Sequence, residues 1–325
     1  MTITIFTAVI SILYYWQLQD QYTYTTNLIQ ERVQEAAIQI DESIKTTTDY
    51  VEQMQIRANS FYEISQIGVA ESLLFDNLKE SEEQGKISYN LDRIPLPYTQ
   101  GLIGNLTGLG ALRDRDSDFY REITMAFSLN PLFQTALKVI PDNLHAYYLS
   151  QKQFINRFPW VDSQTFHFQK DLLDLELFWR SLPENNRSRE QFWTTAYLDP
   201  ANGKVSVTCA APVYEKNKFR GTIALDVTLN ELSKILEKSK FKQGQLFLIN
   251  KGGQILADRE NWEQETPKIE SIWSLIPENL REQFYHFTRD ENLGSQKFGS
   301  YLWFHSSLDQ SPWSLVFFTK QVDIL

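Results

Sequence analysis

The first quarter of the chain contains a long helical pattern of apolar positions. Over residues 25–75, apolar side chains recur three, four and seven positions apart, with polar residues between them. They are Ile29, Val33, Ala37, Ile40, Ile44, Val51, Met54, Ala58 and Phe61. This spacing gathers them on one face of a helix, and no glycine or proline interrupts the pattern before Gly68. We therefore predict one long helix, with residues 19–75 as its full extent, which is too long to cover a single sheet.

The middle of the chain changes to patterns that are typical of strands. Three segments, 193–198, 205–214 and 219–227, are rich in aromatic, β-branched and small apolar residues, and turn-forming residues separate them. Thr228 then supplies a helix N-cap, with Glu231 three positions later, before an apolar helical face. Three antiparallel strands followed by a helix predict a half-covered sheet and an α+β fold.

Weaker patterns outline the remaining elements. Residues 118–130, 131–139 and 270–287 predict helices. The predicted strands outside the middle segment are 145–149, 153–158, 245–250, 254–257, 298–306 and 313–319. Residues 77–110 contain two prolines and several glycines, and we interpret them as a polar connection.

Residues 1–18 carry no charge, and the first charged residue is Asp20. A membrane-spanning helix needs about 20 predominantly apolar residues, so this run is slightly short. It lacks the basic start of a signal peptide, and Tyr14, Tyr15 and Trp16 suit a membrane interface. We predict a membrane anchor at residues 1–18. In one interpretation, a basic cytoplasmic segment at the start of this anchor has been trimmed away. A cleaved signal peptide and an ordinary buried helix are the alternatives.

Composition and charge exclude several classes of protein. The 325 residues have a formal net charge of −10 and are 42% hydrophobic and 14% aromatic, which indicates an ordered chain and disfavours nucleic-acid binding. The single cysteine, Cys209, excludes an intramolecular disulfide and a cysteine-rich metal site. The four histidines show no paired metal-ligand spacing, and no nucleophile elbow, phosphate loop or dinucleotide fingerprint is present. We therefore expect no enzyme activity, no cofactor and no metal.

The middle segment also carries a characteristic set of residues. They are Trp193, Tyr197, Asp199, Gly203, Val207, Thr208, Pro212, Val213, Tyr214, Phe219, Gly221, Asp226, Val227, Thr228 and Leu229. In order and spacing, this set resembles the core signature of double Cache domains. Those are extracytoplasmic sensor modules of bacterial transmembrane signalling receptors, including chemoreceptors, histidine kinases and cyclic-dinucleotide enzymes. The similarity extends more weakly from about Gln30 to the C-terminus.

The resemblance implies an α+β fold in which a long N-terminal helix is followed by two PAS-like lobes with antiparallel sheets. Residues 76–238 correspond to a membrane-distal lobe with the ligand pocket, and residues 239–320 to a membrane-proximal lobe. Residues 321–325 correspond to the start of a second membrane helix. The long helix is implied to be a spine that often forms a homodimer face, and a monomeric spine is the alternative.

Two carboxylates in the middle segment suggest a site for a cation. Asp199 and Asp226 lie at the ends of apolar strands, and Trp179, Trp193 and Tyr197 are the available aromatic rings. In the resemblance, Tyr197, Asp199 and Asp226 fall on ammonium-binding positions. The simpler alternative is that Asp199 is a turn residue and Asp226 a helix-start residue.

Residues 174–185 correspond to the ligand clamp of the family, and they depart from its pattern. Trp179 matches the clamp tryptophan, Leu177 replaces the arginine that binds a ligand carboxylate, and Arg180 replaces a tyrosine. This favours an amine without a carboxylate, unless Arg180 or Arg157 takes over the carboxylate. The predicted ligand site comprises Trp179, Arg180, Trp193, Tyr197, Asp199 and Asp226.

These observations predict an extracytoplasmic small-molecule sensor of a bacterial inner-membrane receptor, with most of the chain in the periplasm or extracellular space. The expected ligand is an amine or resembles an amino acid, and no nucleic-acid partner is expected. One alternative is an interaction module that docks a periplasmic binding protein. A less favoured one is a hydrolase that uses the two aspartates. We expect any cytoplasmic output module beyond Leu325, and its type and the ligand's identity stay open.

Overall fold

The computed structural model of the protein contains two compact units. The described residues are 2–65, 72, 74–83, 85–95, 101–140, 145–199, 203–237, 241, 244–258, 268–289 and 294–323. We name Ile44–Thr228 the nine-stranded unit, after its sheet. Met1–Ser43 and Leu229–Leu325 together form the five-stranded unit.

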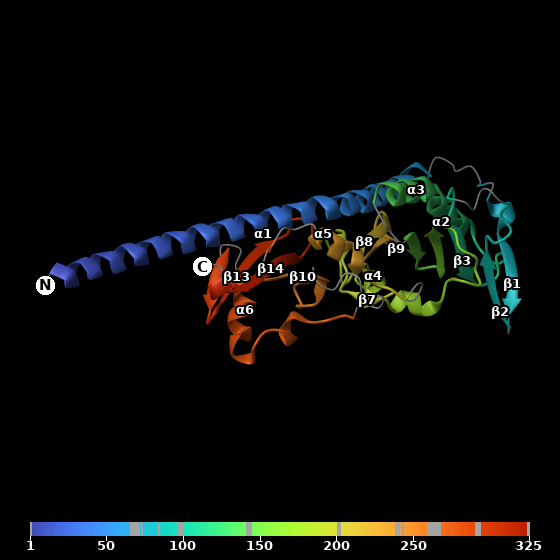
Figure 1. Cartoon of the computed structure of the whole chain (residues 1–325). Coiled ribbons are helices and arrows are strands. Elements are labelled where there is room, and N and C mark those ends of the chain that lie inside the picture. The colour runs from blue at the N-terminus through green and yellow to red at the C-terminus, as the bar shows by residue number, and fades with distance from the viewer. Residues whose placement is uncertain are drawn as a thin grey trace. The chain divides into compact units, whose positions relative to one another are not determined.

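Helix α1, Thr2–Ile64, is one continuous helix that contributes residues to both units (Figure 1). Its apolar stripe is buried as predicted, for example at Val33 and Met54, whereas Ile38 lies outside the stripe and is exposed. The predicted helix end at residue 75 is wrong, because Phe75–Asn77 forms the separate 3-10 helix η1. The helix stops before the first glycine of this region, as the low helix propensity of glycine favours.

Among the described residues, no helix combines the length and the apolar character that crossing a membrane requires. Residues 2–18, which we predicted as an anchor, form the first part of α1. The membrane anchor therefore stays a prediction.

The sheet of the nine-stranded unit is antiparallel throughout its described strand pairs. Its strands are β1 (Lys79–Glu83), β2 (Lys86–Asn90), β3 (Asn105–Leu109), β4 (Ala146–Ser150), β5 (Phe154–Phe158), β6 (Phe192–Trp193), β7 (Tyr197–Leu198), β8 (Val205–Glu215) and β9 (Lys218–Thr228). Their order is β1-β2-β3-β5-β4-β9-β8-β6, and β7 also pairs with β8. The predicted strands that became β4, β5, β8 and β9 are confirmed, whereas the single strand predicted at 193–198 is two short strands.

Residues 77–110 are not the polar connection that we predicted. They contain β1, β2 and β3, which extend the sheet beyond β5. Strand β1 is polar and lies at the sheet edge, so no hydrophobic alternation marks it in the sequence. In β3, a Cβ atom on Gly108 would lie 2.3 Å from the hydroxyl of Tyr89. Close packing inside a strand, rather than a turn, therefore explains this glycine.

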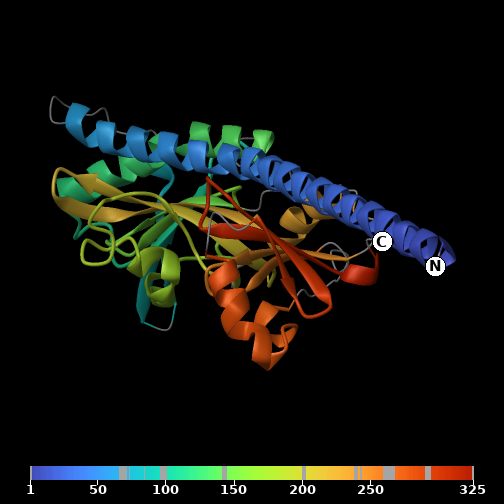
Figure 2. The same cartoon turned by 90° about the vertical axis from the view of Figure 1, so that its left-hand side faces the viewer.

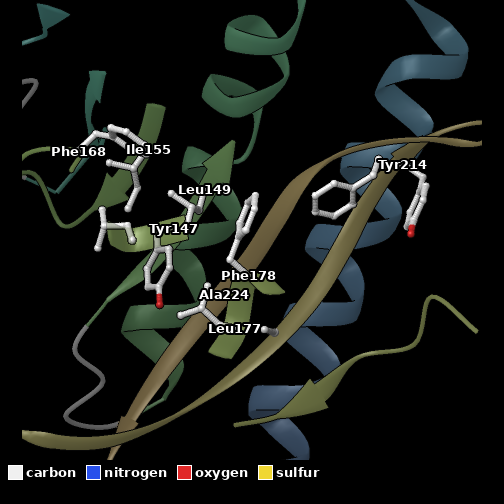
Figure 3. Close-up of a cluster of buried hydrophobic side chains, with 11 residues drawn as sticks. Tyr147, Leu149, Ile155, Phe168, Leu177, Phe178, Tyr214 and Ala224 are labelled. Carbon is white, nitrogen blue, oxygen red and sulfur yellow. The ribbon is translucent and has the colours of Figure 1, made fainter. Parts of the chain in front are cut away.

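Alternating residues of β4 face opposite sides of this sheet. The helices of the unit are α2 (Ser117–Ser128), α3 (Asn130–Val139), the 3-10 helix η2 (Lys170–Asp174) and α4 (Glu176–Trp179). Tyr147 and Leu149 join an apolar cluster to which η2 and α4 contribute (Figure 3). Tyr148 and Ser150 alternate with them along the strand, and both of their hydroxyls donate to Glu122 of α2. Helices α2 and α3 confirm the two helices predicted in this region.

Arg220 of β9 is the centre of a buried ion-pair network. Its two terminal nitrogens each lie 2.7 Å from an oxygen of Asp118, and it also pairs with Glu122 at 3.4 Å and with Glu215. The bond with Arg220 holds the pKa of Asp118 well below its ordinary value, whereas burial raises the pKa of Glu122. The network connects α2 to the central strands, so it stabilises the unit only while all partners are present.

The five-stranded unit has the sheet order β11-β10-β14-β13-β12. Its strands are β10 (Gln245–Asn250), β11 (Ile255–Asp258), β12 (Ser295–Phe298), β13 (Tyr301–Ser307) and β14 (Trp313–Lys320). Its helices besides α1 are α5 (Leu229–Glu237), η3 (Ile272–Ser274), η4 (Glu278–Leu280), α6 (Arg281–Phe287) and η5 (Gln321–Asp323). Helix α6 lies on one side of the sheet, where Phe284 and Phe287 pack with Trp303 and Val316 (Figure 2).

Two predictions for this unit need correction. The helix predicted at 270–287 is regular only in α6, because the chain before Pro277 forms the short helix η3. The strand predicted at 298–306 is divided between β12 and β13, and the turn between them contains Gly299 with a φ of 60°. The predicted strands 245–250 and 313–319 are confirmed by β10 and β14. The side chain of Glu231, predicted for a capping box, lies outside the described part of the chain.

Candidate ligand pocket

Neighbouring strands of the nine-stranded unit bring polar side chains into one pocket. Tyr147 of β4 lies opposite Arg157 of β5, and His145 directly precedes β4. The N–H of Asp226, in β9, donates to the carbonyl oxygen of His145 at 3.0 Å. Side chains at such positions share one face of an antiparallel sheet, and these four line a common cavity.

Tyr197 and Asp199 line the same pocket. They lie near the start of the double Cache signature, whereas Asp226 lies near its end. Tyr197 belongs to β7, which pairs with β8, and Asp199 follows that strand. The backbone of Asp199 closes a turn, because its N–H donates to the carbonyl of Lys204 and its carbonyl accepts from the N–H of Gly203, both at 2.8 Å. Its side chain is nevertheless buried against the cavity. The turn role and the pocket role that we weighed against each other are therefore combined in one residue.

Asp226 accepts three hydrogen bonds through one carboxylate oxygen. Its Oδ1 accepts from the hydroxyls of Thr208 at 2.8 Å, Tyr147 at 3.1 Å and Tyr197 at 3.4 Å. Burial raises the pKa of both tyrosines well above 10, and the nearby Asp226 carboxylate raises them further. The tyrosines therefore stay protonated and orient one carboxylate oxygen, which leaves Oδ2 for another partner.

His145 lies between the two carboxylates. Its Nδ1 is 3.6 Å from Oδ2 of Asp199 and 3.6 Å from Oδ2 of Asp226. Burial lowers the pKa of His145, but the two carboxylates outweigh burial and raise the pKa above its ordinary value of 6.5. The histidine is thus an internal partner for the same oxygens that a bound cation would use.

Arg157 supplies a buried positive charge at the same cavity. The residue is 5% exposed, and its guanidinium lies 4.6 Å from the ring centre of Phe166. Among the described residues, its Nη1 has no hydrogen-bond partner. Burial lowers the pKa of Arg157, and the charges of Asp199 and Asp226 oppose that effect. A buried nitrogen donor without a partner is costly, so this group is suited to an anionic part of a ligand.

The rest of the cavity wall is apolar and closely packed. It is lined by Leu149, Ile155, Phe166, Leu172, Leu175 and Leu177. The accessible volume is about 30 Å³, which is enough for about two water molecules. A larger ligand therefore requires the pocket to widen. Leu177 stands at the clamp arginine's position in the family, and here it contributes apolar surface to the cavity.

Three of the predicted site residues, Trp179, Arg180 and Trp193, do not line this cavity. Arg180 donates through Nη1 to Glu176 and to the carbonyl of Trp193, both at 2.8 Å, and stacks on Phe192 at 4.4 Å. Trp193 is buried in β6, whereas Trp179 is 45% exposed at the end of α4. The described structure thus brings Tyr197, Asp199 and Asp226 together, and it gives Arg180 a structural partner in β6.

Two contributors to the pocket were missed in the sequence, and Arg157 was considered only as a substitute for the clamp arginine. His145 and Tyr147 occupy alternate positions of a predicted strand, so they share one face. A polar pair on the buried face of an otherwise apolar strand is the signal that could have identified them. The histidines show no paired ligand spacing in the sequence because Asp199 and Asp226, the partners of His145, lie far from it along the chain.

One group of potential metal ligands is present among the described residues. Single ligand atoms of His145, Asp199 and Asp226 lie within 4.8 Å of one another. Imidazole and carboxylate groups bind divalent metals such as zinc. Arg157 contributes a positive charge to the same cavity, which disfavours a cation of higher charge than an ammonium group.

Comparison with known proteins agrees with this architecture. Residues 121–234 match the family model of the methyl-accepting chemotaxis protein-like first PDC sensor domain. No curated protein matches the chain in sequence. Among solved structures, the fold is similar to the ligand-binding domain of the Campylobacter jejuni chemoreceptor Tlp3 in complex with 4-methylisoleucine. That match has 13% identity, a TM-score of 0.52 and coverage of 94% of each chain. The same domain in complex with L-norvaline gives 14% identity, a TM-score of 0.50 and 94% coverage of each chain.

Residues 121–234 therefore match the model of a sensor-domain family, and the chain as a whole has the double Cache fold. The α+β architecture of a long N-terminal helix and two antiparallel sheets, which the resemblance implied, is confirmed.

Proposed function

We propose that this chain is the extracytoplasmic sensor of a bacterial membrane receptor, and that its nine-stranded unit binds a small zwitterion of the amino-acid type. The observation that carries the proposal is the buried arrangement of Asp199 and Asp226 beside Arg157. The two carboxylates and the hydroxyl of Tyr197 are suited to the ammonium group of the ligand. The family match, which is to a sensor domain rather than to an enzyme, supports the sensing role.

Arg157 favours a ligand that also carries a carboxylate. From the sequence, the loss of the clamp arginine at Leu177 favoured a simple amine. The buried Nη1 of Arg157 supplies a donor in the same cavity, whereas Arg180 is bonded to Glu176 and Trp193. The apolar wall is suited to an aliphatic side chain. The Tlp3 domain was solved with 4-methylisoleucine and with L-norvaline, which are ligands of this chemistry.

Signalling requires the ligand to favour one conformation over another. The cavity of about 30 Å³ is too small for an amino acid, so binding would widen it and separate the carboxylates from His145. We expect this change to reach a cytoplasmic output module, with residues 1–18 as an inner-membrane anchor. We also expect α1 to provide the surface of a homodimer, since a paired helix transmits a displacement between subunits.

Three matched probes test the ligand chemistry. L-norvaline carries both charged groups, butylamine lacks its carboxylate, and pentanoate lacks its ammonium group. A ligand well above its dissociation constant raises the melting temperature of the protein that binds it. We expect the largest increase with norvaline, a smaller one with butylamine and none with pentanoate. Equal stabilisation by pentanoate and norvaline, or no stabilisation by any standard amino acid, would show that the proposal is wrong.

Three variants then test which side chains bind the ammonium group and the carboxylate of the ligand. Asp226→Asn should weaken both norvaline and butylamine, because it removes the partner of the ammonium group. Arg157→Met should weaken norvaline about tenfold or more and leave butylamine unchanged, because only the carboxylate loses a charged hydrogen bond. Arg180→Met is the matched control and should leave both affinities unchanged. If Arg180→Met weakens norvaline selectively and Arg157→Met does not, the carboxylate site lies at the clamp instead.

A further inference from the structure

The five-stranded unit contains a second and larger cavity. Its accessible volume is about 390 Å³, which lies within the range of small-molecule sites in proteins. It lies where the β10–β11 turn, the end of α6 and the β13–β14 connection meet. It shares no lining residue with the pocket of the nine-stranded unit.

The wall of this cavity combines large apolar side chains. Trp273, Phe284 and Trp313 all line it, and they offer broad apolar surface. The indole N–H of Trp273 donates to the carbonyl of Gly252 at 3.1 Å, and its ring packs edge-on against Phe284 at 5.5 Å. These contacts hold the indole in place, so the cavity is suited to the flat or branched apolar body of a ligand.

Two cationic side chains line the same cavity. Arg289 stacks on the ring of Tyr285 at 3.5 Å and donates through Nη2 to the carbonyl of Lys251 at 3.0 Å. These contacts fix the guanidinium while leaving some of its five N–H donors for other partners. Within the described part of the chain, neither Arg289 nor Lys251 forms an ion pair, and no described acidic residue lines the cavity. The charge of the cavity is therefore positive.

Hydroxyl groups complete the lining. Ser307, Ser311 and Ser314 all line the cavity. The hydroxyl oxygen of Ser311 is buried and has no hydrogen-bond partner among the described residues. A buried hydroxyl without a partner costs stability, and a polar group of a bound molecule would remove that cost.

We propose that this cavity is a second ligand site, which binds a small organic anion with an apolar body, such as an aromatic monocarboxylate. Lys251 and Arg289 bind the carboxylate, and the body lies against Trp273 and Trp313. The selectivity is the reverse of that in the nine-stranded unit, where two carboxylates face an ammonium group. An amino-acid zwitterion is disfavoured here because its ammonium group would face positive charge, and no acidic residue among those that the structure describes lines the cavity. The inference does not depend on the ligand proposed for the other unit.

Calorimetric titration of the whole chain with benzoate, benzyl alcohol and benzylamine tests this site. The three probes share one ring and differ in charge. We expect saturable binding of benzoate, much weaker binding of benzyl alcohol, and no competition between benzoate and norvaline. Absence of saturable binding by benzoate and by aliphatic carboxylates at millimolar concentration would overturn the proposal.

Variants locate the bound anion. Lys251→Gln is an exposed turn substitution that should not disturb folding, and it should weaken benzoate about tenfold. Ser311→Leu should fill the cavity and abolish binding while retaining the melting temperature of the unliganded chain. Lys297→Gln, at an exposed lysine of β12, is the control and should bind benzoate normally. If neither Lys251→Gln nor Ser311→Leu alters the affinity, benzoate binds elsewhere and the proposal is wrong.

Discussion

The two units are built on antiparallel sheets, but they differ in what they bury. The buried charged residues of the nine-stranded unit are Glu122, Arg157, Asp199, Arg220 and Asp226. In the five-stranded unit, the described buried core is largely aromatic and aliphatic, and His305 is its only buried titratable side chain. Charged groups are costly to bury unless they are paired, so each buried charge needs a structural or a functional explanation.

Pairing separates the two explanations within the nine-stranded unit. Arg220 is bonded to Asp118, Glu122 and Glu215, which makes its network structural. Arg157, by contrast, lines a cavity and forms no ion pair within the described part of the chain, although each of the two arginines has one buried nitrogen without a hydrogen-bond partner. The comparison indicates that a buried charge without an ion pair among the described residues, rather than burial alone, marks the candidate ligand pocket.

The largest effect is expected when the structural network is broken. Arg220→Leu removes the bidentate partner of Asp118 and one cationic partner of Glu122, and we expect a loss of about 3–5 kcal/mol of unfolding free energy. Urea unfolding, with hydrogen exchange read separately for each unit, should show that the nine-stranded unit is affected. Arg113→Leu is the control, since the side chains of Arg113 and Asp114 are 82% and 72% exposed, and it should change little. Equal effects of the two variants would contradict the structural role of the network.

A second prediction concerns the loss of stability of the five-stranded unit at acidic pH. Burial lowers the pKa of His305 from 6.5 to about 4, and the residue is 4% exposed. The unfolded chain therefore binds a proton that the folded chain excludes, and stability falls as the pH falls from 6.5 towards 4. The difference corresponds to about 3 kcal/mol. Urea unfolding across this range should show a steeper loss for the natural protein than for His305→Phe. Parallel pH profiles for the two proteins would disprove this role of His305.

The smallest effect on stability is expected at His145, where the pH dependence has the opposite sign to that of His305. Its pKa is raised in the folded state, because the two carboxylates outweigh burial. Its stabilisation is therefore fully present below pH 6.5 and is lost as the pH rises through the folded-state pKa. Protonated His145 also competes with a ligand ammonium group, so norvaline affinity should rise with pH. Titration calorimetry of the natural protein and of His145→Asn should show this rise only in the natural protein. A rise of the same size in both would exclude the competition.

Some elements were predictable because their signals are local. The β8–β9 hairpin and β10 have the expected bounds to within one residue, since apolar strands between polar turns specify their own ends. Gly221 of the family signature, by contrast, is explained by a contact that is distant in the sequence. A Cβ atom there would lie 2.3 Å from the carbonyl oxygen of Leu149 on the neighbouring strand. Other elements gave no such signal: the polar edge strand β1 shows no alternation, and β3 contains a glycine that suggested a turn.

The residues of the candidate site also divide into those that the sequence indicates and those that only the tertiary structure brings together. The resemblance to double Cache domains assigned Tyr197, Asp199 and Asp226 to one pocket, and the structure brings them together because β7 and β9 both pair with β8. Tertiary structure alone added His145 and selected Arg157 rather than Arg180 as the arginine of the pocket, because β4 and β5 reach this pocket through strand pairing across long sequence separations. It also directed Arg180 towards the carbonyl of Trp193, whereas the bond of Arg180 with Glu176 has the i,i+4 spacing of a helical ion pair. The two carboxylates of the pocket thus lie on strands that are close together in the sequence, where the signature could indicate them. The register of strands that are far apart in the sequence decided which cationic side chain faces those carboxylates.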